Sequence, residues 1–174
     1  MDAKDESEYD DLFRAEYPAV WRAVLLIVFD RDIADEVCQD AFAAVFAHWE
    51  KVSTYERPGA WVRRVAIRRA VRVAGRDRRR QATELAGQAR AGRPEGASRW
   101  DETSDLIVEA LAALPPHQRA AIALHYLLDL PVRDVATAIG CREATANVHL
   151  HRGRRHLAEM LRPVLREETD DGTR

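Results

Sequence analysis

The sequence of 174 residues contains only two cysteines, Cys38 and Cys141, which stand far apart. Two distant cysteines exclude a disulfide-rich scaffold, and no paired C-x-x-C motif exists to bind zinc, so we expect two partly buried free thiols. Long apolar runs are also missing, because residues 23–29 end at Asp30, well short of the roughly 20 residues of a membrane span. Residues 2–11 are acidic, unlike the basic start of a signal peptide. These absences predict a cytoplasmic protein with no stable membrane insertion.

Lysine is nearly absent, with Lys4 and Lys51 the only two among 27 basic side chains. The net charge of −2 hides a strong separation, since residues 2–11 carry six acidic side chains and residues 57–93 carry twelve arginines against two acids. Residues 167–171 are acidic again. Acidic ends around a basic middle indicate a protein that binds nucleic acid without being an indiscriminate polycation. A solvated arginine-rich helix would give the same pattern.

No segment alternates apolar and polar residues as a strand does. Apolar residues instead recur every three or four positions, which predicts helices. The clearest helix covers residues 33–49, with Val37 and Phe42 on one face and acidic side chains on the other. Pro18 and Pro163 are expected to kink or end the helices in which they fall. The predicted helices span residues 12–29, 33–49, 59–78, 106–114, 117–128, 132–139 and 143–165.

The periodic pattern disappears over residues 81–104, where several glycines and Pro94 discourage a long helix. We therefore predict an all-α protein with two small helical domains joined by a flexible linker, the second domain a helix-turn-helix. The predicted boundaries are an acidic disordered tail (1–11), a first domain (12–80), the linker (81–104), a second domain (105–166) and an acidic tail (167–174).

Residues 131–161 are the strongest physical signal in the sequence. A short helix, a glycine suited to a helix C-cap at Gly140, and a longer basic helix predict a helix-turn-helix. On the longer helix a stripe of apolar and small residues steps by three or four positions and is expected to pack inward. The stripe consists of Ala146, Leu150, Gly153, Leu157 and Leu161.

The opposite face of the longer helix is polar and cationic. At 100° per residue, Thr145, Val148, Arg152 and Arg155 lie opposite Leu150, as a helix that enters the major groove requires. Val148 is the apolar member, and our hypothesis is that it contacts a thymine methyl group. A helical hairpin with a solvated basic face remains the alternative. Three histidines flank this face, either as neutral residues lining the groove or as a pH sensor; they are His149, His151 and His156.

Three stretches of sequence stand in a fixed order with regular gaps. Residues 35–42 read DEVCQDAF, and residues 58–66 read PGAWVRRVA. Residues 112–119 read AALPPHQR and are followed by the helix-turn-helix, in which residues 145–154 read TANVHLHRGR. In this order, over about residues 12–161, the motifs resemble those of the extracytoplasmic-function branch of the bacterial sigma factors. The resemblance implies a transcription initiation factor, with promoter DNA and core RNA polymerase as partners, an anti-sigma protein as a further partner, and no cofactor.

The resemblance also implies roles for the residues of the first domain. The acidic helix would dock on the clamp helices of the polymerase through Asp35, Glu36, Gln39 and Asp40. An acidic face within a basic domain fits a protein interface. The loop after this helix and the arginine-rich helix would bind the −10 promoter element, where melted bases need stacking surfaces and cationic support. The residues concerned are Lys51, Ser53, Thr54, Tyr55, Arg63, Arg64 and Arg68.

The second domain would read the −35 element as duplex DNA. The residues concerned are Thr145, Asn147, Val148, His149, His151, Arg152, Arg154 and Arg155. The family's usual V-K-S-R-L run is here ANVHL, so Asn147 and His149 replace a lysine and an arginine. This departure predicts weaker phosphate binding or a different DNA sequence preference.

Two other classes of function stay open at this point. A stand-alone helix-turn-helix regulator would use only the second domain and would leave the acidic helix unexplained. A metal-dependent nuclease would use carboxylates such as Asp35, Glu36 and Asp40 with histidine ligands, although no H-E-x-x-H motif and no glycine-rich phosphate loop occur. We therefore predict a non-enzymatic protein.

Overall fold

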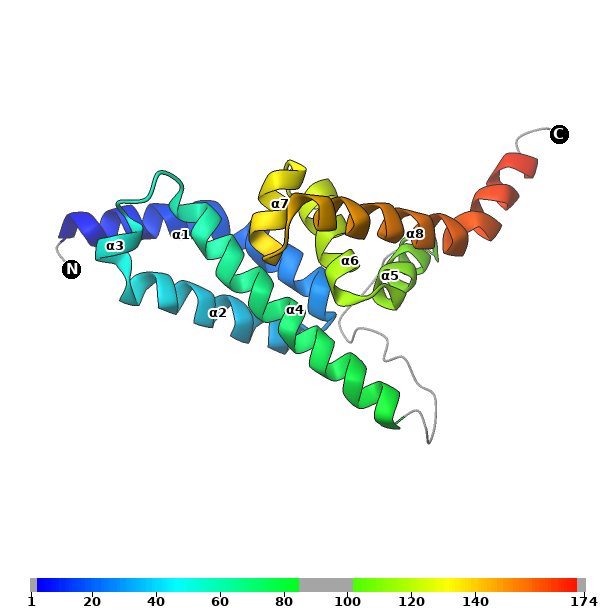
Figure 1. Cartoon of the computed structure of the whole chain (residues 1–174), viewed down its shortest axis with the longest axis horizontal. Helices are drawn as coiled ribbons and strands as arrows, with labels where there is room; N and C mark the ends of the chain where they lie inside the picture. Colours follow the sequence, from blue (N-terminus) through cyan, green and yellow to red (C-terminus); the bar gives the residue numbers. More distant parts are fainter. Residues whose placement is uncertain (1–2, 85–101, 172–174) are drawn as a thin grey trace.

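The computed structural model describes residues 3–84 and 102–171, and within these ranges every regular element is helical (Figure 1). The prediction of an all-α fold is confirmed. The elements are α1 (Ala3–Val28), α2 (Arg31–Ala47), α3 (Trp49–Val52), α4 (Pro58–Glu84), α5 (Glu102–Ala113), α6 (Pro116–Ile122), the π-helical turn η1 (Ala123–Leu127), α7 (Val132–Ile139) and α8 (Glu143–Asp171).

The first domain consists of α1, α2 and α4, which pack along one another, with α3 in the connection between α2 and α4 (Figure 1). Asp30 begins α2, because its side chain accepts a hydrogen bond from the backbone N–H of Ile33 at 2.9 Å. The apolar face predicted for this helix is buried in its middle, at Val37, Ala41, Phe42 and Val45, whereas Phe46 is 50% exposed. Ala34 and Cys38 of α2 are buried as well.

The predicted disordered tail at residues 1–11 is wrong for its described part, because α1 already begins at Ala3. Tyr9 anchors this part of the helix: its ring lies 5.1 Å from that of Phe46 and 5.5 Å from that of Trp49, measured between centroids. Its hydroxyl donates a hydrogen bond to the backbone oxygen of Phe42 at 3.1 Å. Aromatic packing from other helices thus orders an acidic segment that would fray on its own.

Neither predicted proline break ends its helix. Pro18 lies inside α1, and Pro163 lies inside α8, which continues to Asp171. The first part of the predicted acidic tail at 167–174 is therefore helical in its backbone.

The linker predicted at 81–104 is shorter than expected at both ends, because α4 runs to Glu84 and α5 starts at Glu102. The rest of the predicted linker, residues 85–101, lies outside the described residues.

The helix-turn-helix of the second domain is confirmed as α7, a turn at Gly140 and α8. Gly140 has φ +87°, a left-handed conformation that favours glycine, and its N–H donates to the backbone oxygen of Ala136 at 2.8 Å. Ala146, Leu150 and Gly153 are buried, as the inward stripe predicts. A Cβ on Gly153 would lie 3.0 Å from Cγ1 of Ile122, so the missing side chain lets α8 approach α6 closely.

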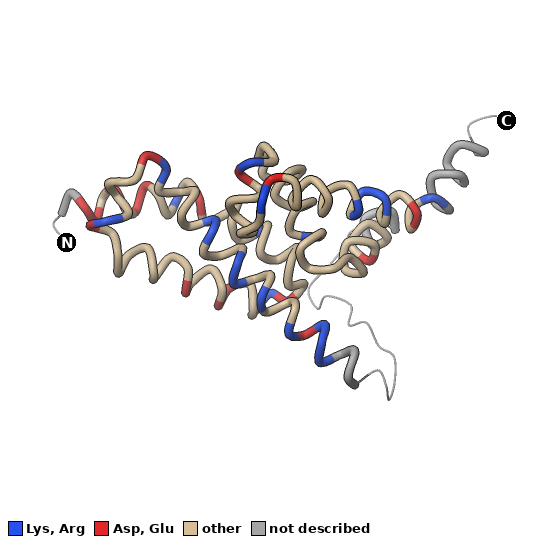
Figure 2. Tube along the Cα trace, viewed as in Figure 1, with Lys and Arg blue, Asp and Glu red and all other residues tan. Residues whose placement is uncertain are grey.

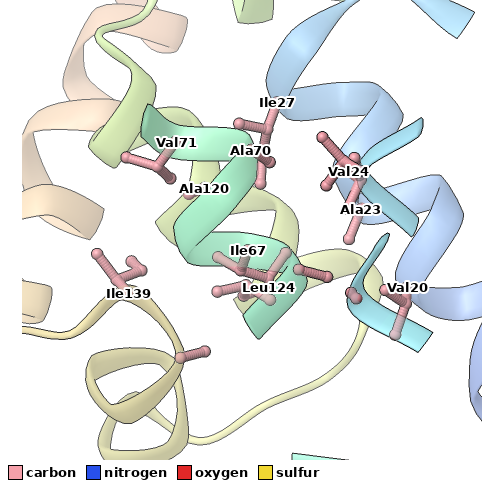
Figure 3. Close-up of a cluster of buried hydrophobic side chains, with 14 of the residues drawn as sticks. Val20, Ala23, Val24, Ile27, Ile67, Ala70, Val71, Ala120, Leu124 and Ile139 are labelled. Atoms are coloured by element: carbon pink, nitrogen blue, oxygen red, sulfur yellow. The ribbon is translucent and has the colours of Figure 1, made fainter. Parts of the chain in front are cut away.

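The two domains share one hydrophobic core, which the sequence did not predict. Figure 3 shows Val24 and Ile27 of α1 and Ile67 and Val71 of α4 gathered with side chains of the second domain. The second domain contributes Ala120, Leu124 and Ile139. Apolar burial therefore holds the domains together in this structure.

Arg119 of α6 adds a polar connection at the same interface. Its side chain is buried, and its guanidinium donates to the backbone oxygen of Ile27 at 2.6 Å and to those of Ala112 and Leu114, both at 3.0 Å. The guanidinium also lies 4.8 Å from the ring centroid of Phe29. Burial lowers the pKa of Arg119 to about 10, and the charge of Arg78 contributes to the shift. The bond to Ile27 ties the C-terminal end of α1 to the second domain.

Replacing Arg119 by methionine is expected to lower the free energy of unfolding by about 2–4 kcal/mol, because three carbonyl oxygens lose a charged donor. Urea unfolding followed by circular dichroism measures the change. The matched control is Arg142→Met, since Arg142 is exposed. Equal losses in the two variants would contradict a structural role for the Arg119 hydrogen bonds.

Candidate nucleic-acid interface

The exposed face of α8 matches the surface predicted to enter the major groove. Val148 is 44% exposed although it is apolar, while Ala146 and Leu150 on the opposite side are buried. Arg155 lies 3.6 Å from the carboxylate of Glu159, an exposed pair of small energetic weight. The predicted −35 residues that are exposed are Thr145, Asn147, Val148, His151, Arg152, Arg154 and Arg155.

The histidines of α8 do not form one DNA-facing cluster. His149 is half-buried and its ring stacks on that of His117, with 5.5 Å between centroids. His156 also faces α6, because its Nδ1 lies 3.0 Å from Oε1 of Gln118. His151 alone of the three is exposed. Burial lowers the pKa of His149, and the charges of His117 and Arg152 lower it further.

The lowered pKa of His149 predicts a pH-dependent stability. The imidazole of His149 binds a proton more readily in the unfolded chain than in the folded protein. The resulting contribution to stability is therefore complete above a pH of about 6.5 and is lost as the pH falls below that value. The urea midpoint of His149→Gln should therefore fall less than that of the wild type between about pH 7.5 and about pH 5.5. The control is His151→Gln; if it reduces the fall as much as His149→Gln does, the effect does not come from burial of His149.

The loop predicted to contact melted bases is a short turn after α3. Thr54 donates its hydroxyl hydrogen to the backbone oxygen of Lys51 at 2.8 Å, and Ser53 donates to that of Glu50 at 3.4 Å. Local bonds of this kind stabilise turns. The ring of Tyr55 is 36% exposed, and Lys51 is exposed. The loop thus presents the ring of Tyr55 and the ammonium group of Lys51, and the hydroxyls of Ser53 and Thr54 stabilise its backbone.

The arginines of α4, which form the blue band along the helix in Figure 2, have different surroundings. Arg63 lies 3.4 Å from the carboxylate of Glu16, and both side chains are 20% exposed. Arg64 is half-buried. Arg68 is exposed and donates to the backbone oxygen of Thr137 in α7 at 3.2 Å. The three predicted −10 arginines therefore do not form one free phosphate-binding row in this packed arrangement.

The acidic face of α2 is partly neutralised within the chain. Asp35 accepts a hydrogen bond from Nε1 of Trp21 at 2.6 Å. Arg69 of α4 pairs with Asp40 and lies 3.6 Å from the carboxylate of Glu36. Glu36 keeps 70% of its side chain exposed, and Gln39 is also exposed.

The sequence patterns did not single out three basic residues whose contacts hold this region together. Arg69 contacts the acidic face of α2. It follows Arg68 directly and therefore points to another side of α4, which the sequence could have indicated. Arg57 pairs with Asp134 of α7 at 3.0 Å, and Arg119 joins the two domains. Only the tertiary arrangement brings Arg57 and Arg119 close to their partners, which lie far away in the sequence.

Two absences concern the part of the chain that the structure describes. Among the side chains that the structure describes within residues 3–84 and 102–171, no group of three or more His, Cys, Asp or Glu gathers where it could hold a metal ion. No helix in the same ranges is long and apolar enough to cross a membrane.

Two family models match the chain in succession. Residues 12–81 match Sigma-70 region 2, and residues 104–157 match Sigma-70 region 4. The first match runs from the middle of α1 almost to the end of α4 and includes the loop after α3. The second runs from the start of α5 into the middle of α8 and includes the turn of the helix-turn-helix.

Individual relatives match over most of the chain. The ECF RNA polymerase sigma factor SigL of Mycobacterium tuberculosis is 31% identical over 146 residues, covering 78% of this chain and 79% of that protein. The RNA polymerase sigma-E factor of Streptomyces antibioticus is 26% identical, covering 88% and 84%. The sigma factor RpoE from Bartonella quintana, solved in complex with the anti-sigma factor NepR, has the same fold, with a TM-score of 0.68, 22% identity and coverage of 89% and 97%.

Proposed function

The chain belongs to the extracytoplasmic-function branch of the sigma-70 family of RNA polymerase sigma factors, and from this premise we propose which of its surfaces contact DNA and polymerase. A sigma factor directs promoter-specific initiation while bound to core polymerase. The observation that carries the assignment of surfaces is the exposed, cationic face of α8, the second helix of the helix-turn-helix. Family membership does not favour a stand-alone regulator or a nuclease.

In this proposal α8 reads the −35 element in the major groove. Thr145 stands in the first turn, Val148 presents an apolar surface to a thymine methyl group, and Arg152 reaches a guanine edge or a phosphate. The half-buried His149 supports the helix against α6 and contributes an edge of its ring to the groove. The exposed cations nearby bind backbone phosphates.

The turn after α3 and the start of α4 bind the −10 element in the same proposal. The exposed ring of Tyr55 stacks on an unpaired base, and Lys51 and the hydroxyls of Ser53 and Thr54 contact the strand. Arg64 and Arg68 support the phosphates. Arg63 contributes mainly by holding α4 against α1 through Glu16, which keeps the turn in position.

The polymerase contact is assigned to the exposed side of α2. Glu36 and Gln39 point outward, whereas Asp35 and Asp40 are each tied to a neighbouring helix by Trp21 or Arg69. These two residues shape the surface and leave part of their charge available to a basic partner.

Promoter binding requires the two domains to separate. By their names the −10 and −35 elements lie about 25 base pairs apart, which is about 85 Å of duplex. In the packed structure Arg57, beside the −10 loop, contacts Asp134 of the helix-turn-helix at 3.0 Å. Docking on polymerase therefore has to replace the shared core with polymerase contacts.

The packed form also suggests how the protein is restrained. The related Bartonella sigma factor was solved with an anti-sigma factor, and we propose a protein inhibitor of the same class for this chain. We further propose that the protein acts in the cytoplasm, where core polymerase and promoter DNA are found.

Run-off transcription with core polymerase and a genomic library tests the whole proposal. Promoter-dependent transcripts are expected, together with co-purification of the chain with core polymerase. Specific DNA binding by the chain alone, without polymerase binding or transcripts, would instead support a stand-alone regulator.

Substitutions in α8 test the −35 surface. Arg152→Ala should reduce promoter-specific transcription about tenfold, because a good contact to a base edge contributes about 1–3 kcal/mol. Val148→Ser should relax the preference for thymine at one position. The matched control is Arg162→Ala, an exposed arginine two to three turns farther along α8. Equal losses at Arg152 and Arg162 would contradict the assigned surface, and an unchanged base preference in Val148→Ser would refute the methyl contact.

A further inference from the structure

A cleft of about 600 Å³ lies between α4 of the first domain and the start of α6 and end of α7 in the second. This volume is in the range of small-molecule sites in proteins. Most of its polar lining is cationic. The lining residues that matter are Arg68, Arg72, Arg78 and Arg79 from α4 and His117 from α6.

The lining of α4 follows from helical geometry. Arg68, Arg72, Gly75 and Arg79 are three or four residues apart and share one face of the helix. Gly75 stands in the middle of this row, and a Cβ built there would have its nearest neighbouring atom, an Arg79 nitrogen, 3.9 Å away. The missing side chain leaves open space between the flanking arginines.

Positive charge gathers on the α4 side of this cleft. Among the described residues, neither Arg72 nor Arg78 has a carboxylate within salt-bridge distance, in contrast to Arg69, which pairs with Glu36 and Asp40 on the other side of the same helix. Asp77, the acid nearest in sequence, does not line the cleft. The charge of Arg78 also contributes to the lowered pKa of the buried Arg119. A ligand that supplies negative charge would relieve this accumulation.

We propose that this cleft binds a small anion with two or more linked phosphates, of nucleotide size, and that the bound ligand stabilises the packed arrangement of the two domains. Guanidinium groups bind phosphate oxygens with paired hydrogen bonds, which favours phosphate over smaller anions. Four arginines spread over three helical turns match a chain of phosphates better than a single one. His117 contributes from the second domain, so the complete site exists only while the domains are packed.

The cleft fits a small ligand better than promoter DNA, because its walls come from both domains and it exists only while they are packed. On promoter DNA the domains are far apart; this comparison with DNA rests on the proposed function. Ligand binding itself can be tested on the protein alone. Failure of this inference would leave the transcription assay unchanged, and failure of transcription would leave the binding result standing.

Calorimetric titration of the full chain with ATP, inorganic tripolyphosphate and adenosine tests the inference, with thermal unfolding as a second readout. ATP and tripolyphosphate should bind with dissociation constants of about 1 mM or tighter and raise the unfolding midpoint, whereas adenosine should do neither. Arg72→Ala with Arg78→Ala should weaken binding about tenfold or more. His117→Ala should also weaken it, although it lies in the other domain.

The matched control is Arg76→Ala, which removes the same charge from the exposed side of the same helix without touching the cleft. An equal loss in this control would show attraction to overall positive charge and would overturn the site. Unchanged binding in His117→Ala would overturn a site that spans both domains. Absence of binding by both polyphosphates, with single-stranded DNA binding that depends on Arg72 and Arg78, would assign these arginines to nucleic acid instead.

Discussion

The buried guanidinium of Arg119 is the interaction on which the arrangement of this protein depends. A charge removed from water needs hydrogen-bond acceptors, and one of its three carbonyl partners, that of Ile27, belongs to the other domain. Phe29 supplies a ring beneath the charge from a backbone with φ +55°, an uncommon conformation for a residue with a side chain. The end of α1 is therefore shaped to receive a residue that is 92 positions away. Apolar side chains around this contact complete a core common to both domains.

This shared core separates the packed protein from its form on a promoter. The segments that carry the proposed −10 surface lie against α7, the first helix of the helix-turn-helix, through Arg57 and Asp134 and through Arg68 and the Thr137 carbonyl. Binding to polymerase has to offset the loss of these contacts and of the buried apolar area. Any ligand or protein that binds the packed form alone shifts the equilibrium away from the promoter. A ligand in the arginine-lined cleft and the proposed protein inhibitor would both act in this way, by stabilising the packed form relative to the promoter-bound form.

Arginine shows why composition alone cannot assign roles. Arg63 holds α4 to α1, and Arg69 neutralises part of the acidic face of α2. Arg72 lines a cleft and has no carboxylate partner among the residues that the structure describes. All three lie on one helix within ten residues, yet each points to a different neighbour. The charge pattern indicated a protein that binds nucleic acid, and membership of the sigma factor family supports this interpretation. It could not show which arginines the folded protein already uses, because that depends on helices brought alongside from elsewhere in the chain.

The sequence by itself determined the helices, the helix-turn-helix and the exposed face of α8, because periodicity and the Gly140 cap act over a few residues. It also carried the family motifs that indicated a sigma factor. Tertiary structure decided the ordered start of α1, where Tyr9 packs on Phe46 and Trp49, and the partial burial of His149. It alone decided that the two domains join through Arg119, since pairing a buried charge with distant carbonyls depends on how helices pack and has no local signature in sequence.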